Sequence, residues 1–195
     1  MNTVLLQALG GGLTSFLPMI GIAIVFYLFF IRPQNKQRKE AAQLLEDLKK
    51  AIDFAGLDGD TKIIVLKSGG DRTFCSGASF TELISINDLE TGKQFFSGFA
   101  NVINACRKCP KLIIGRVQGK AVGGGVGVAS AVDYCLATKF ASAKLSELNV
   151  GIGPFVVGPA VERKVGISAM SQMTMNADHF YSAEWAKQKG LYADV

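Results

Sequence analysis

The chain has 195 residues, of which 49% are apolar and 19% are charged; this balance excludes a disordered protein and allows one folded domain with an appendage. The formal net charge of +5 does not indicate a nucleic-acid-binding protein, because much of the excess lies in one short cluster and the other charges are mixed in sign. The basic cluster consists of Arg32, Lys36, Arg38 and Lys39.

A membrane-spanning helix is predicted near the N-terminus, at about residues 13–31. No charged residue precedes Arg32, and residues 15–31 are apolar almost throughout, which is about the length that crosses a bilayer. A cleaved signal peptide would have a basic start and a shorter apolar run, and a helix of a soluble core would show a polar face. Because the basic cluster follows the span directly, we expect a single-pass protein of the inner membrane with its C-terminal part in the cytoplasm.

The rest of the chain alternates predicted helices and strands. Apolar residues at helical spacing predict an amphipathic helix over residues 41–55, and a buried strand over residues 62–67 follows it. A second helix includes residues 95–103 and ends before Pro110. The later predicted elements are a strand at 112–117, a glycine-rich turn at 119–127 leading into a helix of small residues, a strand at 134–138, and helices from 168 onward and at 182–189. This alternation predicts an α/β domain with largely parallel, buried strands.

The four cysteines are irregularly spaced, at Cys75, Cys106, Cys109 and Cys135, which in a cytoplasmic protein predicts free thiols. Cys106 and Cys109 form a C-x-x-C pair. A zinc site would need two further ligands at suitable spacing, and a redox pair would need a thioredoxin-like strand-to-helix turn. Neither context is present, so the sequence predicts no metal site.

Two turns carry the strongest indication of chemistry. The glycine-rich stretch at residues 123–127 lacks the third glycine of a dinucleotide fingerprint, and the upstream glycine of a P-loop is missing too. What remains is a tight turn at a helix start, where free backbone N–H groups can stabilise an anion or a developing oxyanion. A second turn of this kind follows the predicted strand at 62–67 and covers residues 72–80. Together the two turns can form one oxyanion hole.

Three stretches, in this order, resemble signatures of the crotonase family, also called the enoyl-CoA hydratase/isomerase family. They are residues 73–80 (TFCSGASF), 117–125 (VQGKAVGGG) and 143–154 (AKLSELNVGIGP). The resemblance covers about residues 41–195 and implies a crotonase-like spiral of β-β-α turns, incomplete because the domain is truncated at both ends. It also implies an acyl-CoA thioester as the substrate, with no separate cofactor and no metal.

The same resemblance assigns the site residues. It implies that the N–H groups of Ala78 and Gly124 form an oxyanion hole that stabilises a thioester enolate. Glu147 falls on the second of the family's two glutamates and is the implied acid/base catalyst. Substrate-binding positions in the same motifs are Cys75, Gly77, Gly123 and Gly125.

Two departures from the family pattern affect the expected reaction. Gly127 stands where the family has its first glutamate, and a glycine cannot transfer a proton, so isomerase activity is favoured relative to hydratase activity. Ser79 stands where the family usually has an aspartate, and serine can also cap the start of a helix. The leading hypothesis is therefore an acyl-CoA hydratase or isomerase with a single acid/base glutamate.

Residues 1–40 have a resemblance of their own, to YajC, the small accessory subunit of the Sec preprotein translocase. It rests on residues 1–8 (MNTVLLQA), 15–18 (SFLP) and 30–34 (FIRPQ), and it implies membrane lipid and Sec components as partners. The alternative function is thus a non-catalytic membrane protein that carries a crotonase-derived tail. A third interpretation is a fusion of two unrelated pieces. Truncation also counts against the homotrimer that the crotonase family usually forms.

Overall fold

The computed structural model describes residues 19–20, 22, 25, 27 and 32–195, and the chain divides into two compact units, Met1–Ala41 and Ala42–Val195. The predicted membrane span at about residues 13–31 lies mostly outside the described residues. Among the residues that are described, no helix is both long enough and apolar enough to cross a bilayer.

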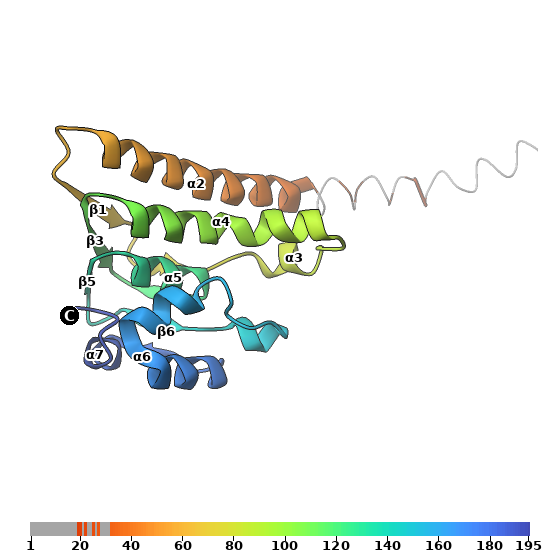
Figure 1. Ribbon diagram of the computed structural model, residues 1–195. Coiled ribbons are helices and arrows are strands. Elements are labelled where there is room, and N and C mark those ends of the chain that lie inside the picture. The colour runs from red at the N-terminus through yellow and green to blue at the C-terminus, as the bar shows by residue number, and fades with distance from the viewer. Residues whose placement is uncertain (1–18, 21, 23–24, 26, 28–31) are drawn as a thin grey trace, which may run out of the picture. The chain divides into compact units, whose positions relative to one another are not determined.

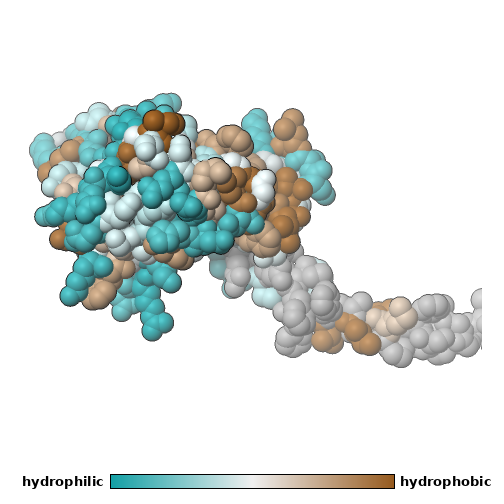
Figure 2. Space-filling model, turned by 90° about the horizontal axis from the view of Figure 1, so that it is seen from below, coloured by the Kyte–Doolittle hydropathy of each residue, from teal (hydrophilic) through white to brown (hydrophobic). Residues whose placement is uncertain are grey.

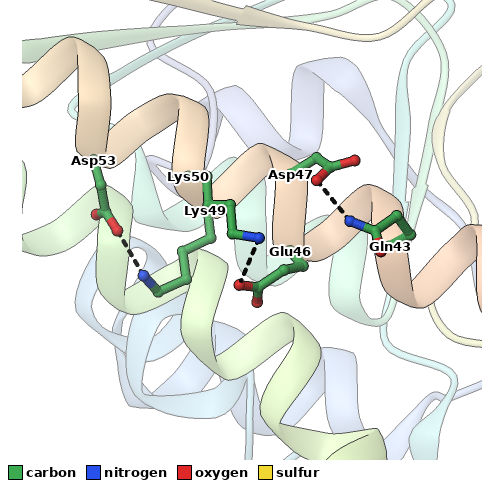
Figure 3. Close-up of polar contacts among 6 residues, drawn as sticks. All are labelled: Gln43, Glu46, Asp47, Lys49, Lys50 and Asp53. Carbon is green, nitrogen blue, oxygen red and sulfur yellow. Dashed lines mark hydrogen bonds and ion pairs between the residues drawn. The ribbon is translucent and has the colours of Figure 1, made fainter.

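Helix α2 (Arg32–Leu57) contains the amphipathic helix predicted at residues 41–55 and is longer at both ends. Figure 3 shows the polar pairs along it, each four residues apart: Gln43 with Asp47 at 2.7 Å, Lys50 with Glu46 at 3.4 Å, and Lys49 with Asp53 at 2.6 Å. Ile52 is buried, and Leu45 and Leu48 pack against the core. Leu44, predicted for the same apolar face, is exposed.

One sheet has three parallel strands in the order β1-β3-β5. The strands are β1 (Ile63–Lys67), β3 (Leu112–Val117) and β5 (Tyr134–Ala137). The three strands predicted in these regions are confirmed, and they are parallel as expected. The prediction that the strand at 62–67 is buried is wrong, because Ile63 and Val65 are 51% and 60% exposed. Alternate side chains of a strand point to opposite faces, so these two lie on a face that the described residues leave largely uncovered.

The covered face of this sheet contributes Ile113 and Val117, both fully buried. Helix α4 (Leu89–Lys108) is capped at its N-terminus by Asp88, whose carboxylate accepts a hydrogen bond from the backbone N–H of Thr91. The helix ends before Pro110, as predicted. In Figure 1, α4 runs alongside the part of α2 that belongs to the same unit. Contact between the two helices is close, because a Cβ added at Gly98 would lie 2.9 Å from Leu45.

A second sheet, in the order β2-β4-β6-β7, is absent from the sequence-based prediction. Its strands are β2 (Thr73–Cys75), β4 (Lys120–Val122), β6 (Ser142–Lys144) and β7 (Tyr181–Ser182). β2, β4 and β6 are parallel to one another, and β7 is antiparallel to β6. Buried Gln118, which follows β3, links the two sheets. Its amide donates to the hydroxyl of Ser68, just after β1, at 2.8 Å and to the carbonyl of Thr73 on β2 at 3.1 Å.

Helices α5 (Gly124–Ala131) and α7 (Ala183–Gln188) pack against the second sheet, and α6 (Gly158–Met175) packs against α5. Helix α5, which contacts both α4 and α6, is buried from its second residue to its last, which explains why it contains only small and β-branched residues. Helix α6 is kinked at Gly166, where φ is +76°. The helix predicted from residue 168 is the part after this kink, and the earlier part was not predicted. Helix α7 is confirmed and is capped by Ser182.

Candidate active site

The carboxyl ends of three parallel strands bring the candidate site residues together. Strand β2 leads into residues 76–79, β4 leads into residues 123–124, and β6 leads into Ser146 and Glu147. Because these strands are parallel neighbours, the segments that follow them meet at one edge of the sheet. All three segments line a single cavity of about 800 Å³.

The turn after β2 depends on Gly77. Its φ of +81° lies in the left-handed region, and a Cβ there would lie 2.9 Å from the Val122 carbonyl oxygen and 3.5 Å from the Gly124 nitrogen. Gly77 therefore lets the first turn approach the second at the position of Gly124. Ser79 then caps helix α3 (Phe80–Leu83), accepting a hydrogen bond from the Glu82 N–H at 3.3 Å, as the sequence predicted. Ala78, between these residues, lines the cavity.

The turn after β4 positions the start of α5. Gly123 has φ +50° and donates its N–H to the Lys144 carbonyl at 2.9 Å, while its own carbonyl accepts from the Val126 N–H at 2.9 Å. Gly124 is the first residue of α5, where N–H groups have no acceptor within the helix and carry partial positive charge. The Phe99 ring lies 2.6 Å from the place of a Cβ on Gly124, so no larger residue fits there.

Cys75 and Gly125, predicted to bind substrate, are not among the residues that line the cavity. A Cβ at Gly125 would lie 2.5 Å from the Cys75 carbonyl oxygen, so the end of β2 packs directly against the first turn of α5. Burial raises the pKa of the Cys75 thiol, and a hydrogen bond with the Gly77 backbone opposes this effect. The contact between Cys75 and Gly125 brings the two turns together.

Glu147 is the first residue of a short 3-10 helix, η2 (Glu147–Val150), which Gly151 ends with a φ of +76°. Its carboxyl group lies against the second turn, because Oε1 is 3.2 Å from the place of a Cβ on Gly123. Burial raises the pKa of this carboxyl, and backbone hydrogen bonds at Glu147 and Ser146 partly oppose the increase. Its Oε2 atom is buried without a hydrogen-bond partner. The group is thus placed to take up or release a proton inside the cavity.

No side chain can occupy the position of Gly127 without rearrangement. A Cβ there would lie 2.6 Å from Val157 and 2.9 Å from Ile103. Among the described residues that line the cavity, Glu147 is the only one with a titratable side chain. No group of three His, Cys, Asp or Glu residues in the described part of the chain is arranged to hold a metal ion.

Sequence reasoning missed most of the apolar wall of the cavity. The sequence predicts only that Phe95 and Phe99 lie on one face of a helix, and the structure shows that both line the cavity. The segment after Gly151 also contributes, through Ile152 and Phe155. The spacing of phenylalanines on α4 was a visible signal, but it did not reveal whether that face meets a core or a cavity.

Comparisons with known proteins identify the family of this chain. The family model described as enoyl-CoA hydratase/isomerase matches residues 25–195. The mitochondrial methylglutaconyl-CoA hydratase of Mus musculus is 31% identical over 153 residues, covering 78% of this chain and 48% of that protein. The peroxisomal Delta(3,5)-Delta(2,4)-dienoyl-CoA isomerase of Arabidopsis thaliana is 27% identical over 186 residues, covering 88% of this chain and 65% of that protein.

The fold is also similar to that of a solved structure, a putative enoyl-CoA hydratase/isomerase (crotonase) from Legionella pneumophila. The TM-score is 0.74 at 31% identity, covering 78% of this chain and 59% of that one. The chain thus spans about half to two thirds of the length of the proteins compared with it. The comparisons do not support the resemblance of residues 1–40 to YajC, and the family match begins at residue 25, inside that stretch.

Proposed function

Because the chain belongs to the enoyl-CoA hydratase/isomerase family, we propose that it moves a proton on an acyl-CoA thioester through an enolate, with Glu147 as the single acid/base. Enzymes of this family act on CoA thioesters without a separate cofactor. One observation carries the proposal. The Glu147 carboxyl is partly buried, has no hydrogen-bond partner at Oε2, and lines the same cavity as the turns that contain Ala78 and Gly124.

The two turns would stabilise the enolate. In the proposed complex the thioester oxygen accepts hydrogen bonds from the N–H groups of Ala78 and Gly124. As a proton leaves the acyl chain, negative charge develops on that oxygen, and donors held in place beforehand stabilise it without reorganising. One such donor typically accelerates a reaction by about 100- to 1000-fold.

The reaction type follows from the number of acid/base groups. Addition of water across a double bond is helped by a second group that orients the water, and Gly127 offers none. A single carboxylate can instead remove a proton from one carbon of the acyl chain and return it to another, which shifts the double bond. The raised pKa of Glu147 suits both steps, because the group can gain and lose a proton closer to neutral pH. Isomerisation is therefore proposed as the main activity.

The test is to measure conversion of 3-enoyl-CoA to 2-enoyl-CoA, and hydration of crotonyl-CoA, with the purified full chain. Glu147→Gln should lower isomerisation by about 100- to 10,000-fold, the range that general acid/base groups contribute. Glu162→Gln, an exposed glutamate on α6, is the matched control and should keep full activity. Equal activity of Glu147→Gln and the unmodified chain would rule out the proposed role of Glu147.

A further inference from the structure

The wall of the cavity next to the oxyanion turns is aromatic. Phe99 is 8% exposed and its ring lies against Gly124, one of the two proposed oxyanion donors. Phe95 and Phe96 lie earlier on the same helix, and their ring centroids are 5.0 Å apart in an edge-to-face arrangement. Both rings line the cavity. The cavity therefore has a wall of apolar rings, one of which lies beside a proposed oxyanion donor.

The apolar lining continues to the mouth of the cavity. Phe80 on α3 and Phe155 after η2 line it and are 57% and 85% exposed. Exposed aromatic side chains beside a cavity are apolar surface that a ligand can cover. On the face drawn in Figure 2, hydrophobic residues gather toward one end of the C-terminal unit, while hydrophilic residues cover most of the rest. A ligand with a long apolar part would therefore contact several of these phenylalanine rings.

The charges of the residues that line the cavity disfavour an acyl group that ends in a carboxylate. The described residues that line the cavity include no lysine, arginine or histidine, and Glu147 is the only charged residue among them. A carboxylate at the far end of an acyl chain would lose its hydration among phenylalanine rings and find no cation to pair with. Repulsion from ionised Glu147 would add to this penalty.

Building on the proposed function, we infer that the acyl group is an uncharged, apolar chain of medium or greater length, not a short or carboxylated one. The cavity volume of about 800 Å³ lies toward the upper end of the range for small-molecule sites. Each additional buried methylene strengthens binding, so affinity should rise as the chain lengthens along the phenylalanine wall.

Binding can be measured separately from turnover by titration calorimetry of the full chain with unreactive CoA thioethers. The three probes carry a butyl group, an octyl group, and an octyl group that ends in a carboxylate. We expect the octyl probe to bind at least about tenfold more tightly than either of the others. Equal affinities for the three probes, or no binding of the octyl probe, would overturn the inference.

A variant that introduces a positive charge provides a second test. Phe96→Arg places a cation on the wall of the cavity. It should reduce the ratio of the affinities of the plain and carboxylated octyl probes by at least about tenfold. Phe54→Arg makes the same change on exposed α2, outside the cavity lining, and should leave the ratio unchanged. An unchanged ratio in Phe96→Arg would also contradict the inference. Turnover of 3-octenoyl-CoA in parallel tests the proposed function, so tight octyl binding without turnover would refute only the catalytic proposal.

Discussion

At the scale of single residues, Glu147 combines two properties that work against each other. Its burial favours the protonated carboxyl, whereas its proposed role as a base requires the ionised form. Because Oε2 is buried without a hydrogen-bond partner, no protein group compensates a negative charge at that atom. A residue held in this way lowers stability, which is the cost expected of a group with the proposed catalytic role.

The raised pKa predicts how stability depends on pH. Since the folded state binds this proton more tightly than the unfolded state, Glu147 lowers stability as the pH rises above the ordinary value of 4.5 and through the folded pKa. Glu147→Gln should therefore have a higher melting temperature than the unmodified chain in mildly alkaline buffer, with the difference shrinking as the pH falls toward 4.5. Thermal unfolding followed by circular dichroism measures this. A difference that grows on acidification would contradict the assigned direction.

The same pKa predicts the acidic limb of the pH–rate profile. If ionised Glu147 removes the proton, kcat/KM for isomerisation should rise with pH and reach half its maximum above pH 4.5, the ordinary value for a glutamate. The measurement is initial rate against pH with one substrate at low concentration. An activity that falls over this range would mean that protonated Glu147 is the active form in the free enzyme.

Gly127 provides a stability prediction at the same scale. Gly127→Ala adds a methyl group into space held by Val157 and Ile103, and overpacking of this kind costs about 1–3 kcal/mol. For a chain of this size that lowers the melting temperature by roughly 2–12 °C. Gly59→Ala, where a Cβ would meet nothing within 4 Å, is the control and should change the melting temperature little. Equal melting temperatures of the two variants would show that position 127 has room for a side chain.

At the scale of secondary-structure elements, the site depends on strands of only three residues each. β2, β4 and β6 are too short to show an alternating pattern, and each exists because its parallel neighbour supplies hydrogen bonds. β3, in contrast, has six residues and was predicted with the bounds that the structure shows. The strands of the first sheet could be predicted from the sequence, while the three-residue strands that position the candidate site could not.

The turn between β2 and α3 can be tested through its glycine. Gly77→Ala forces a side chain into a left-handed conformation, at about 1–2 kcal/mol, and against the Val122 carbonyl oxygen. Displacement of Ala78 should then reduce kcat/KM by about 100-fold, as for the loss of one oxyanion donor. Gly70→Ala carries a similar backbone penalty at φ +73° but meets no atom within 4 Å. It should lose stability and keep activity, and a comparable loss of activity there would weaken the assignment of the turn.

At the scale of the whole molecule, attachment to the membrane remains a prediction from the sequence. The full chain should stay in the membrane pellet after alkaline carbonate washing, because an apolar span at residues 13–31 resists extraction. Replacing this span with a glycine–serine segment should release the protein. Release of the unmodified chain by carbonate would contradict the predicted anchor.

From the sequence alone one could predict the class of the fold, parts of helices α2, α4 and α6, the strands of the first sheet, and three motifs that resemble one family. These are local features, since periodicity, turn residues and motif spacing depend on neighbours along the chain. For that reason the Ser79 cap and the end of α4 before Pro110 were predicted correctly.

Which face of each element meets a cavity, a core or solvent became clear from the packed structure. It showed that Val157 and Ile103 fill the space beside Gly127, that Cys75 packs on Gly125 instead of lining the cavity, and that Ile63 is exposed. These facts depend on contacts between residues that are far apart in the sequence. Local patterns of residue type do not reveal such contacts. The same limit explains why the phenylalanine wall, built from α3, α4 and the segment after η2, emerged only once these elements were packed together.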